Sequence, residues 1–285
     1  MKDNETIVAI IYDFDKTLCD KDMQEYSFIP NLGMNPDAFW KLTNEFVKQE
    51  KMDKILGCMY MMLNEAKKHN KVITKEYLSS LGNDINFFPG ILTWFERINE
   101  YGKSFGLKIE HYIISSGLRE IIKGTKISKY FKEVYACSFL YDDKGEVVWP
   151  KMSVNYTTKV QFLSRINKGV LDISNDYELN MKMLDEDRRI STKNMIYLGD
   201  GLTDIPSMRM TRENGGYAIA VYQNDDKRIA NNLLSDNRID FYAKANYEEN
   251  SEIDRLIKNI LASIAIKSRL KDLHNLQLKE IDRDW

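Results

Sequence analysis

Two carboxylates follow a nearly continuous apolar run close to the N-terminus of this sequence. The stretch IVAIIYDFDKTLCD, residues 7–20, places Asp13 and Asp15 one residue apart. Carboxylates this close repel each other unless something cationic lies between them. In an extended backbone, residues i and i+2 point the same way, so we expect both to face one spot while Phe14 points away. A simple strand-end turn is the alternative, because Asp is common in turns.

A second pair of carboxylates follows another apolar run. The segment MIYLGDGLTD, residues 195–204, contains Asp200 and Asp204, and the glycines beside Asp200 allow a sharp backbone turn. If the two preceding strands are neighbours, Asp13, Asp15 and Asp200 converge at the carboxyl edge of a sheet, where open α/β folds bind ligands. Three hard oxygen donors with room for water suit Mg²⁺, which would relieve the repulsion.

Two further segments supply groups for an anion. The run IISSG places Ser115, Ser116 and Gly117 after a strand and just ahead of an expected helix, where a hydroxyl and backbone N–H groups favour phosphate. Lys159, in YTTKVQF, opens another helix and could reach the same point as a fixed positive charge. Taken alone, Ser115 and Ser116 fit a helix cap and Lys159 fits a surface lysine.

Together these groups fit phosphoryl transfer. Phosphate monoesters hydrolyse slowly unaided, so charge neutralisation and in-line positioning are the main requirements. A carboxylate can attack phosphorus and form an aspartyl phosphate, with Mg²⁺ and Lys159 cancelling the repulsion between the two anions. A second acid two residues on could protonate the leaving oxygen and then activate water.

The elements that must position these residues read as alternating strands and helices. Strands are expected at 7–14, 111–115, 133–139, 194–199, 216–222 and 239–245, and crossover helices at 117–131 and 157–169. The strands are continuously apolar, which is typical of a parallel sheet covered on both faces. The sequence therefore predicts an α/β fold with a doubly wound, Rossmann-like parallel sheet, and a hairpin at 139–149.

One region interrupts this alternation. Residues 19–87 contain no convincing strand and carry apolar residues at helical spacing, so we expect a helical cap inserted into a core formed by residues 1–18 and 88–285. The methionines of this insert fit helix packing better than an adaptable pocket. The polar stretch 172–192 is expected to be a surface excursion. The apolar stripe at 253–264 is expected to pack on the sheet, with a dimer contact or a membrane-surface helix as lesser possibilities.

The motifs in this order resemble the haloacid dehalogenase (HAD) superfamily. Its pattern of DxDxT, a Ser or Thr, a Lys and GDxxxD reads here as DFDKT, IISSG, Lys159 and GDGLTD. The resemblance implies that Asp13 is the nucleophile and an Mg²⁺ ligand. Asp15 would be the general acid/base, with its backbone carbonyl on the metal, and Thr17 would steady the loop. An acid at position 15 is typical of the phosphatases and phosphotransferases of the superfamily, not of its dehalogenases.

The resemblance also implies roles for the later motifs. Ser115 would hold the phosphoryl group with the backbone of Ser116 and Gly117, and Lys159 would bridge phosphate and nucleophile. Two further carboxylates would serve the metal, Asp200 as a ligand and Asp204 as a nearby partner, directly or through water.

The segment after the first motif looks most like the phosphoserine phosphatase-like branch of the superfamily. In this family an insert at 19–87 is a helical cap that closes over the active site and selects the substrate. Asp22 falls where that enzyme carries a Glu that contacts the substrate amine. Solvent exposure or helix capping explains a single acidic residue there equally well, and the excursion at 172–192 departs from the compact form of that branch.

Composition narrows the class of partner. The net charge of −2 provides no global field for nucleic acid or anionic lipid, so neither is an expected partner. Three widely spaced cysteines fit neither a disulfide framework nor a zinc site. Together with the absence of a visible signal peptide or membrane span, this leads us to expect a cytoplasmic protein.

The expected function is Mg²⁺-dependent hydrolysis of a small phosphorylated metabolite through an aspartyl phosphate on Asp13. A phosphotransferase or phosphomutase on the same core is the first alternative, and a catalytically silent binding protein the second. The sequence predicts neither the specific substrate nor the oligomeric state.

Overall fold

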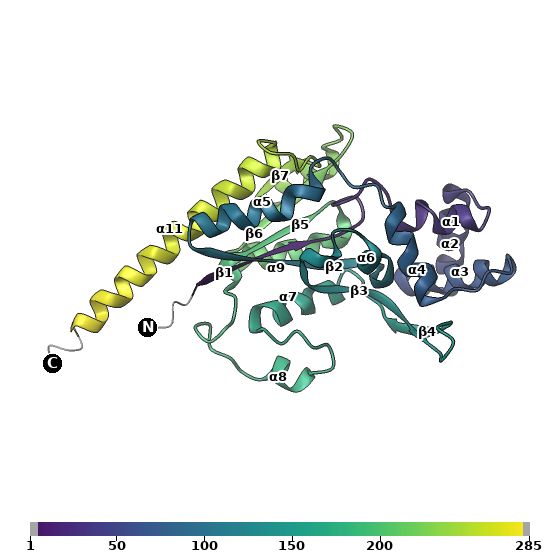
Figure 1. Cartoon of the computed structure of the whole chain (residues 1–285), viewed down its shortest axis with the longest axis horizontal. Coiled ribbons are helices and arrows are strands. Elements are labelled where there is room, and N and C mark those ends of the chain that lie inside the picture. The colour runs from purple at the N-terminus through teal and green to yellow at the C-terminus, as the bar shows by residue number, and fades with distance from the viewer. Residues whose placement is uncertain (1–4, 282–285) are drawn as a thin grey trace.

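Seven strands form one sheet at the centre of the molecule, in the order β4-β3-β2-β1-β5-β6-β7 (Figure 1). The computed structural model describes residues 5–281; residues 1–4, part of the segment that predicts no signal peptide, lie outside them. Neighbouring strands are parallel except for β3 and β4, which form an antiparallel hairpin. The strands are β1 Thr6–Tyr12, β2 Leu107–Leu118, β3 Phe131–Tyr141, β4 Val147–Met152, β5 Met195–Gly199, β6 Tyr217–Tyr222 and β7 Phe241–Lys244. The predicted α/β fold with a doubly wound sheet is confirmed.

Helices cover both faces of the sheet, which explains the continuous apolarity of its strands. In β1, the residues from Val8 to Tyr12 are fully buried. Helices α5 (Ile91–Ser104) and α11 (Glu252–Ile281) lie on one face, and α7 (Thr158–Lys168) and α9 (Ile205–Glu213) on the other (Figure 1). A further helix, α10 (Arg228–Ser235), packs against β6 and β7.

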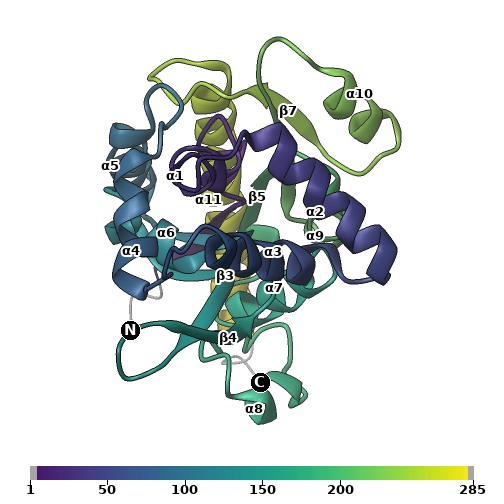
Figure 2. The ribbon, with the colours of Figure 1, turned by 90° about the vertical axis from the view of Figure 1, so that its right-hand side faces the viewer.

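The first three helices of the expected cap lie beyond the carboxyl ends of the strands. These are α1 (Phe28–Asn31), α2 (Pro36–Glu50) and α3 (Lys54–Lys68), which stand in front of the sheet in Figure 2. Side chains fix two of their starts: Asn35 accepts the N–H of Asp37, and Asp53 accepts those of Ile55 and Leu56. The methionines at 59, 61 and 62 are buried, as helix packing requires.

The expected cap also contacts the core directly. Its last helix packs on a core helix, and its residue Ile73 binds the β3–β4 hairpin of the sheet. Helix α4 (Lys75–Ser80) packs on α6 (Arg119–Gly124), where a Cβ on Gly124 would come within 1.8 Å of the Ser79 carbonyl oxygen. From the hairpin, the Val147 N–H donates to the Ile73 carbonyl. The cap boundaries at residues 19 and 87 stay a prediction.

The expected helix at 117–131 is wrong in extent. Strand β2 continues to Leu118, α6 ends at Gly124, and a separate turn at Ser128–Tyr130 precedes β3. Helix α6 ends at Gly124 because glycine is a poor helix former. At this position α4 also lies too close to the backbone of Gly124 for a side chain. Strand β1 also ends earlier than expected, at Tyr12, so a loop and not strand alternation places Asp13 and Asp15.

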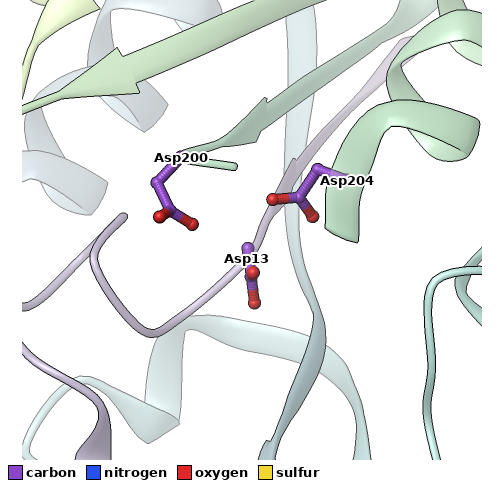
Figure 3. A group of neighbouring side chains, drawn as sticks. All are labelled: Asp13, Asp200 and Asp204. Atoms are coloured by element: carbon purple, nitrogen blue, oxygen red, sulfur yellow. The ribbon is translucent and has the colours of Figure 1, made fainter. Parts of the chain in front are cut away.

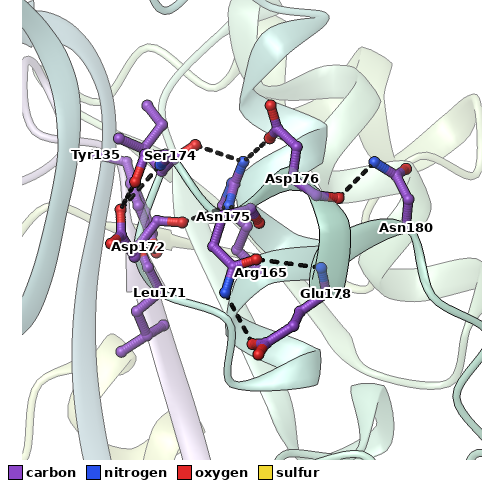
Figure 4. A network of polar contacts seen from close by, with 10 residues as sticks. Tyr135, Arg165, Leu171, Asp172, Ser174, Asn175, Asp176, Glu178 and Asn180 are labelled. Carbon is purple, nitrogen blue, oxygen red and sulfur yellow. Dashed lines mark hydrogen bonds and ion pairs between the residues drawn. The ribbon is translucent and has the colours of Figure 1, made fainter.

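The excursion at 172–192 is a surface segment that a buried arginine ties to the core. Arg165, on α7 and 1% exposed, donates to the carbonyls of Asp172 at 2.7 Å and Ile173 at 3.0 Å, and to the Asp176 carboxylate at 2.7 Å (Figure 4). Asp176 begins the short helix α8 (Asp176–Asn180). The helix that carries Lys159 therefore also holds this excursion.

The C-terminal helix confirms the predicted packing over its first half. Ile253, Ile257, Leu261 and Ile264 of α11 are buried, and the helix contacts α5 and β7. Its last turns extend away from the body of the molecule (Figure 1). Within residues 5–281, no helix combines the length and the apolarity that crossing a bilayer would require.

A chain of hydrogen bonds fixes His111, in strand β2, as a neutral side chain. The Trp94 indole N–H donates to the Tyr12 hydroxyl at 2.9 Å, which leaves the hydroxyl proton for Nδ1 of His111 at 3.0 Å. The other ring nitrogen, Nε2, lies 3.0 Å from the Asn99 side-chain oxygen. Burial lowers the pKa of His111 to about 3, so the folded protein excludes a proton that the unfolded chain binds.

We therefore expect the contribution of His111 to stability to fall as the pH drops from about 6.5 towards 3, because the unfolded state then binds more protons at this residue. The variant His111→Gln should lose about 1–3 kcal/mol at pH 7 but depend less steeply on pH in that window. Denaturant unfolding across the pH range measures both, with His69→Gln at an exposed histidine as control. An unchanged pH slope in His111→Gln would contradict this.

Candidate active site

Three carboxylates from two distant parts of the chain meet at the carboxyl edge of the sheet. Asp13 follows β1, Asp200 follows β5, and Asp204 begins α9 (Figure 3). One oxygen of each lies within 4.8 Å of one oxygen of the others. The convergence depends on the direct pairing of β1 with β5, which the Asp13 N–H extends by donating to the Leu198 carbonyl at 2.9 Å.

A buried lysine lies between two of these carboxylates. Lys159 is completely buried near the start of α7, and its ammonium donates to Asp13 Oδ2 at 2.9 Å and to Asp204 Oδ1 at 2.7 Å. Burial alone would lower the pKa of Lys159, but the charges of Asp13 and Asp204 raise it well above its ordinary value. The lysine is therefore a permanent cation, although it carries one charge against three carboxylates.

Burial and the remaining negative charge of the cluster together raise the pKa values of Asp200 and Asp204. Burial, together with Asp204 and Asp13, raises the pKa of Asp200 well above its ordinary value. Burial also raises the pKa of Asp204 to about 6, although Lys159 opposes the shift. A second cation would favour ionisation of both carboxyl groups by pairing with their charged forms.

The donor set fits a hard divalent cation. The cluster offers carboxylate oxygens only, and Asp204 Oδ2 is buried without a hydrogen-bond partner among the described residues. A buried oxygen without a partner destabilises the fold unless a bound ligand pairs with it. Oxygen ligands of this kind are those that Mg²⁺ prefers.

Asp15 lies beside the cluster but is held separately. Its Oδ1 accepts the Met23 N–H at 2.9 Å, so the first residues of the expected cap hold this carboxyl group. Burial, followed by the charges of Asp22 and Asp13, raises the pKa of Asp15 well above its ordinary value. A carboxyl group that keeps its proton to higher pH is suited to act as an acid.

The expected phosphate-binding residues end β2 on the neighbouring strand. The register pairs Tyr12 with Ile113, which places Ser115 two residues further along at the same edge. The Ser115 hydroxyl oxygen accepts the Gly117 N–H at 3.1 Å, and the Ser116 hydroxyl is buried without a partner among the described residues. A Cβ on Gly117 would lie 3.1 Å from Asp15 Oδ2 and 2.0 Å from the Met23 methyl group, so a side chain at this position would displace Met23.

Thr17 is fully buried in the loop after Asp15. Tyr247 donates its hydroxyl proton to the Thr17 carbonyl at 2.8 Å, and the Thr17 hydroxyl has no partner among the described residues. Lys16, between Asp15 and Thr17, has a left-handed backbone with φ 57°. Tyr247, which is distant in the sequence, therefore holds this loop through its backbone.

Asp22 does not point freely toward a substrate. Its carboxylate pairs with the Lys16 ammonium at 2.5 Å, and its side chain is 29% exposed. A substrate amine at this place would have to replace Lys16 as the partner of Asp22.

Sequence reasoning missed two residues that hold the site. Met23 holds Asp15 through its N–H, and Tyr197 donates to Asp204 Oδ1 at 2.7 Å. The one sequence signal for Tyr197 is a hydroxyl in an otherwise apolar strand; nothing in the sequence distinguishes Met23.

Comparison with known proteins identifies the family. The chain belongs to the putative phosphatase family, whose model matches residues 8–223. It is 29% identical over 280 residues to a protein of Borreliella burgdorferi described as uncharacterized, covering 89% of this chain and 96% of that one.

Solved structures share the fold. A HAD family hydrolase from Salmonella enterica serovar Typhi matches with a TM-score of 0.52 and 20% identity, over 75% of this chain and 62% of that one. A phosphoserine phosphatase captured as a phospho-aspartyl intermediate analogue matches with a TM-score of 0.53 and 15% identity, over 89% and 99% of the two chains. The expected HAD superfamily resemblance, in its phosphoserine phosphatase-like branch, is confirmed at the level of the fold, and the family match confirms a phosphatase family.

The buried lysine generates a prediction on stability. The variant Lys159→Met should lose about 3–5 kcal/mol, because it leaves buried carboxylates without their cation. Mg²⁺ should recover part of this loss, and should stabilise the variant more than the wild type. Thermal and denaturant unfolding with Mg²⁺ or with EDTA measure both effects.

Lys182→Met, at an exposed lysine of the excursion, is the matched control. If Lys159→Met loses no more stability than this control and does not respond to Mg²⁺, the carboxylates do not form one charge-compensated cluster.

Proposed function

We propose that this protein is a Mg²⁺-dependent phosphatase that hydrolyses small phosphate monoesters through an aspartyl phosphate on Asp13. The observation that carries the proposal is the buried Lys159 ammonium bound to Asp13 and Asp204, with Asp200 beside them. A cation fixed against a carboxylate that faces further acids is what an anionic nucleophile needs to approach an anionic phosphate.

The residues of the chain divide the reaction into two displacements. In the first, a carboxylate oxygen of Asp13 attacks phosphorus, the ester P–O bond breaks, and the leaving oxygen takes the proton of Asp15. In the second, Asp15, now ionised, takes a proton from water as the water oxygen attacks phosphorus. The Asp13–phosphorus bond breaks, inorganic phosphate leaves, and both carboxyl groups return to their starting states.

The remaining groups orient the phosphoryl oxygens and compensate their charge. Asp13 Oδ1 accepts the Phe14 N–H at 2.7 Å, which fixes the rotation of the nucleophile. Lys159 holds its other oxygen, and Ser115 with the backbone of Ser116 and Gly117 would receive the phosphoryl oxygens. Asp13, Asp200 and Asp204, with the backbone carbonyl of Asp15, would hold Mg²⁺, which supplies charge neutralisation when bound.

The substrate is proposed only as a class. The segment that begins the expected cap contacts the site through the Met23 N–H and the Asp15 carboxylate, which supports a role of the cap in selecting the leaving group. Asp22 is proposed as a substrate contact for a ligand whose cationic group replaces Lys16.

The nucleophile is tested by Asp13→Asn, which should abolish turnover of an aryl phosphate because an amide cannot form the phosphoenzyme. We expect wild-type protein to form a beryllofluoride adduct on Asp13 in the presence of Mg²⁺. Assay of phosphate release and a structure of the adduct check both. Asp185→Asn, where the side chain is 95% exposed, is the matched control.

Activity near the wild-type level in Asp13→Asn, or an adduct on a different residue, would refute the assignment. Wild-type transfer of the phosphoryl group to an added alcohol or sugar phosphate in preference to water would favour the phosphotransferase or phosphomutase instead.

Asp15→Asn tests the general acid/base. General acid–base catalysis is typically worth about 10²–10⁴-fold, so steady-state turnover should fall by that order. A nitrophenolate leaving group needs no proton, so the first step should survive better than the second and phosphoenzyme should accumulate. Rapid-quench kinetics should then show a burst of nitrophenolate equal to the enzyme concentration. Turnover at the wild-type rate would exclude the role.

A further inference from the structure

A tyrosine hydroxyl completes the buried network behind the lysine. Tyr197 lies in the middle of β5 and is fully buried, as are Asp204 and Lys159. Its hydroxyl donates to Asp204 Oδ1 at 2.7 Å, the same oxygen that receives the Lys159 ammonium at 2.7 Å. Asp204 thus connects Tyr197 with Lys159 by accepting a hydrogen bond from each of them. Lys159 in turn donates to Asp13 at 2.9 Å.

The two oxygens of Asp204 therefore have different surroundings. Oδ1 receives two donors, whereas Oδ2 has no hydrogen-bond partner among the described residues. A Cβ on Gly199 would come within 2.4 Å of Oδ2, so the backbone of β5 approaches this oxygen closely. With Tyr197 on one oxygen and Gly199 against the other, rotation of the carboxylate is restricted.

We propose that Tyr197 is a positioning residue: its hydroxyl fixes the Asp204 carboxylate so that Oδ1 directs the Lys159 ammonium onto Asp13 and Oδ2 stays free for the cation. This rests on the proposed function and adds a residue to its site. The Tyr197 hydroxyl acts here as the hydrogen-bond donor to Asp204 Oδ1. Its influence on the reaction passes through Asp204 and Lys159.

The chain offers a matched control for this hydroxyl. Tyr112, in β2, is also fully buried, and it donates to the carboxylate of Glu110 at 2.6 Å. Glu110 is in turn paired with a cation, Arg189, at 2.5 Å. Tyr112→Phe therefore removes the same kind of bond, from a strand tyrosine to an ion-paired carboxylate, outside the carboxylate cluster.

The test compares Tyr197→Phe with Tyr112→Phe by steady-state kinetics on an aryl phosphate, Mg²⁺ titration calorimetry and thermal unfolding. Partners that orient metal ligands are typically worth about 10–100-fold in affinity or activity. We expect kcat of Tyr197→Phe to fall about tenfold or more while KM changes less than about threefold, and Mg²⁺ to bind about tenfold more weakly. Tyr112→Phe should lose similar thermal stability and keep both kcat and Mg²⁺ affinity.

A double-mutant cycle with Asp204→Ala, which removes the acceptor of the Tyr197 hydroxyl, isolates the pathway. If Tyr197 acts through Asp204, removing its hydroxyl in the Asp204→Ala background should change kcat and Mg²⁺ affinity less than twofold. Tyr197→Met, a flexible apolar replacement without a donor, repeats the test should Tyr197→Phe not fold.

Two outcomes separate this inference from the proposed function. Retention of wild-type kcat and Mg²⁺ affinity in Tyr197→Phe, with only the loss of stability seen for Tyr112→Phe, overturns the positioning role. Failure of the wild type to hydrolyse any phosphate ester, combined with weakened Mg²⁺ binding in Tyr197→Phe, refutes the phosphatase and leaves the positioning of Asp204 supported.

Discussion

The contact between the Lys159 ammonium and the carboxylates of Asp13 and Asp204 is the interaction on which the site depends. Each of these groups would be costly to bury alone, because ionised side chains lose their hydration inside a protein. Buried together, they tie the end of β1, the start of α9 and the start of α7 to one point. The same contact places a cation on the proposed nucleophile, so folding and chemistry require one arrangement.

The sheet order makes that arrangement possible. Because β1 lies between β2 and β5, the segments that follow all three strands open at one edge, where the proposed nucleophile, phosphate-binding residues and metal ligands meet. Two glycines leave room for side chains at this edge. The Asp204 carboxylate lies close to Gly199, and the side chains of Asp15 and Met23 lie close to Gly117. Helix α7 supplies Lys159 near its first turn and, through Arg165, holds the surface excursion.

The sequence predicted the fold and the convergence of Asp13 with Asp200 because both depend on local patterns, continuous apolar runs followed by acids. It predicted the extent of 117–131 wrongly, because the helix ends where α4 packs on Gly124, a contact between distant segments. The pairing of Asp22 with Lys16 and the Tyr197 hydroxyl bond are also tertiary contacts, which no spacing rule encodes. The motifs located the site; packing decided which neighbours complete it.

The central claim is that the carboxylates of Asp13, Asp200 and Asp204 are a divalent-cation site completed by Lys159, and locating the ion tests it most directly. A crystal of the protein with Mn²⁺ in place of Mg²⁺, measured at the manganese absorption edge, would show the ion by its anomalous scattering. The account predicts one strong peak at oxygen-ligand distances, about 2.0–2.2 Å, from Asp13 and Asp200, with the lysine still bound to Asp13. Saturating Mn²⁺ with no peak at this cluster, or a peak at other residues only, would contradict it.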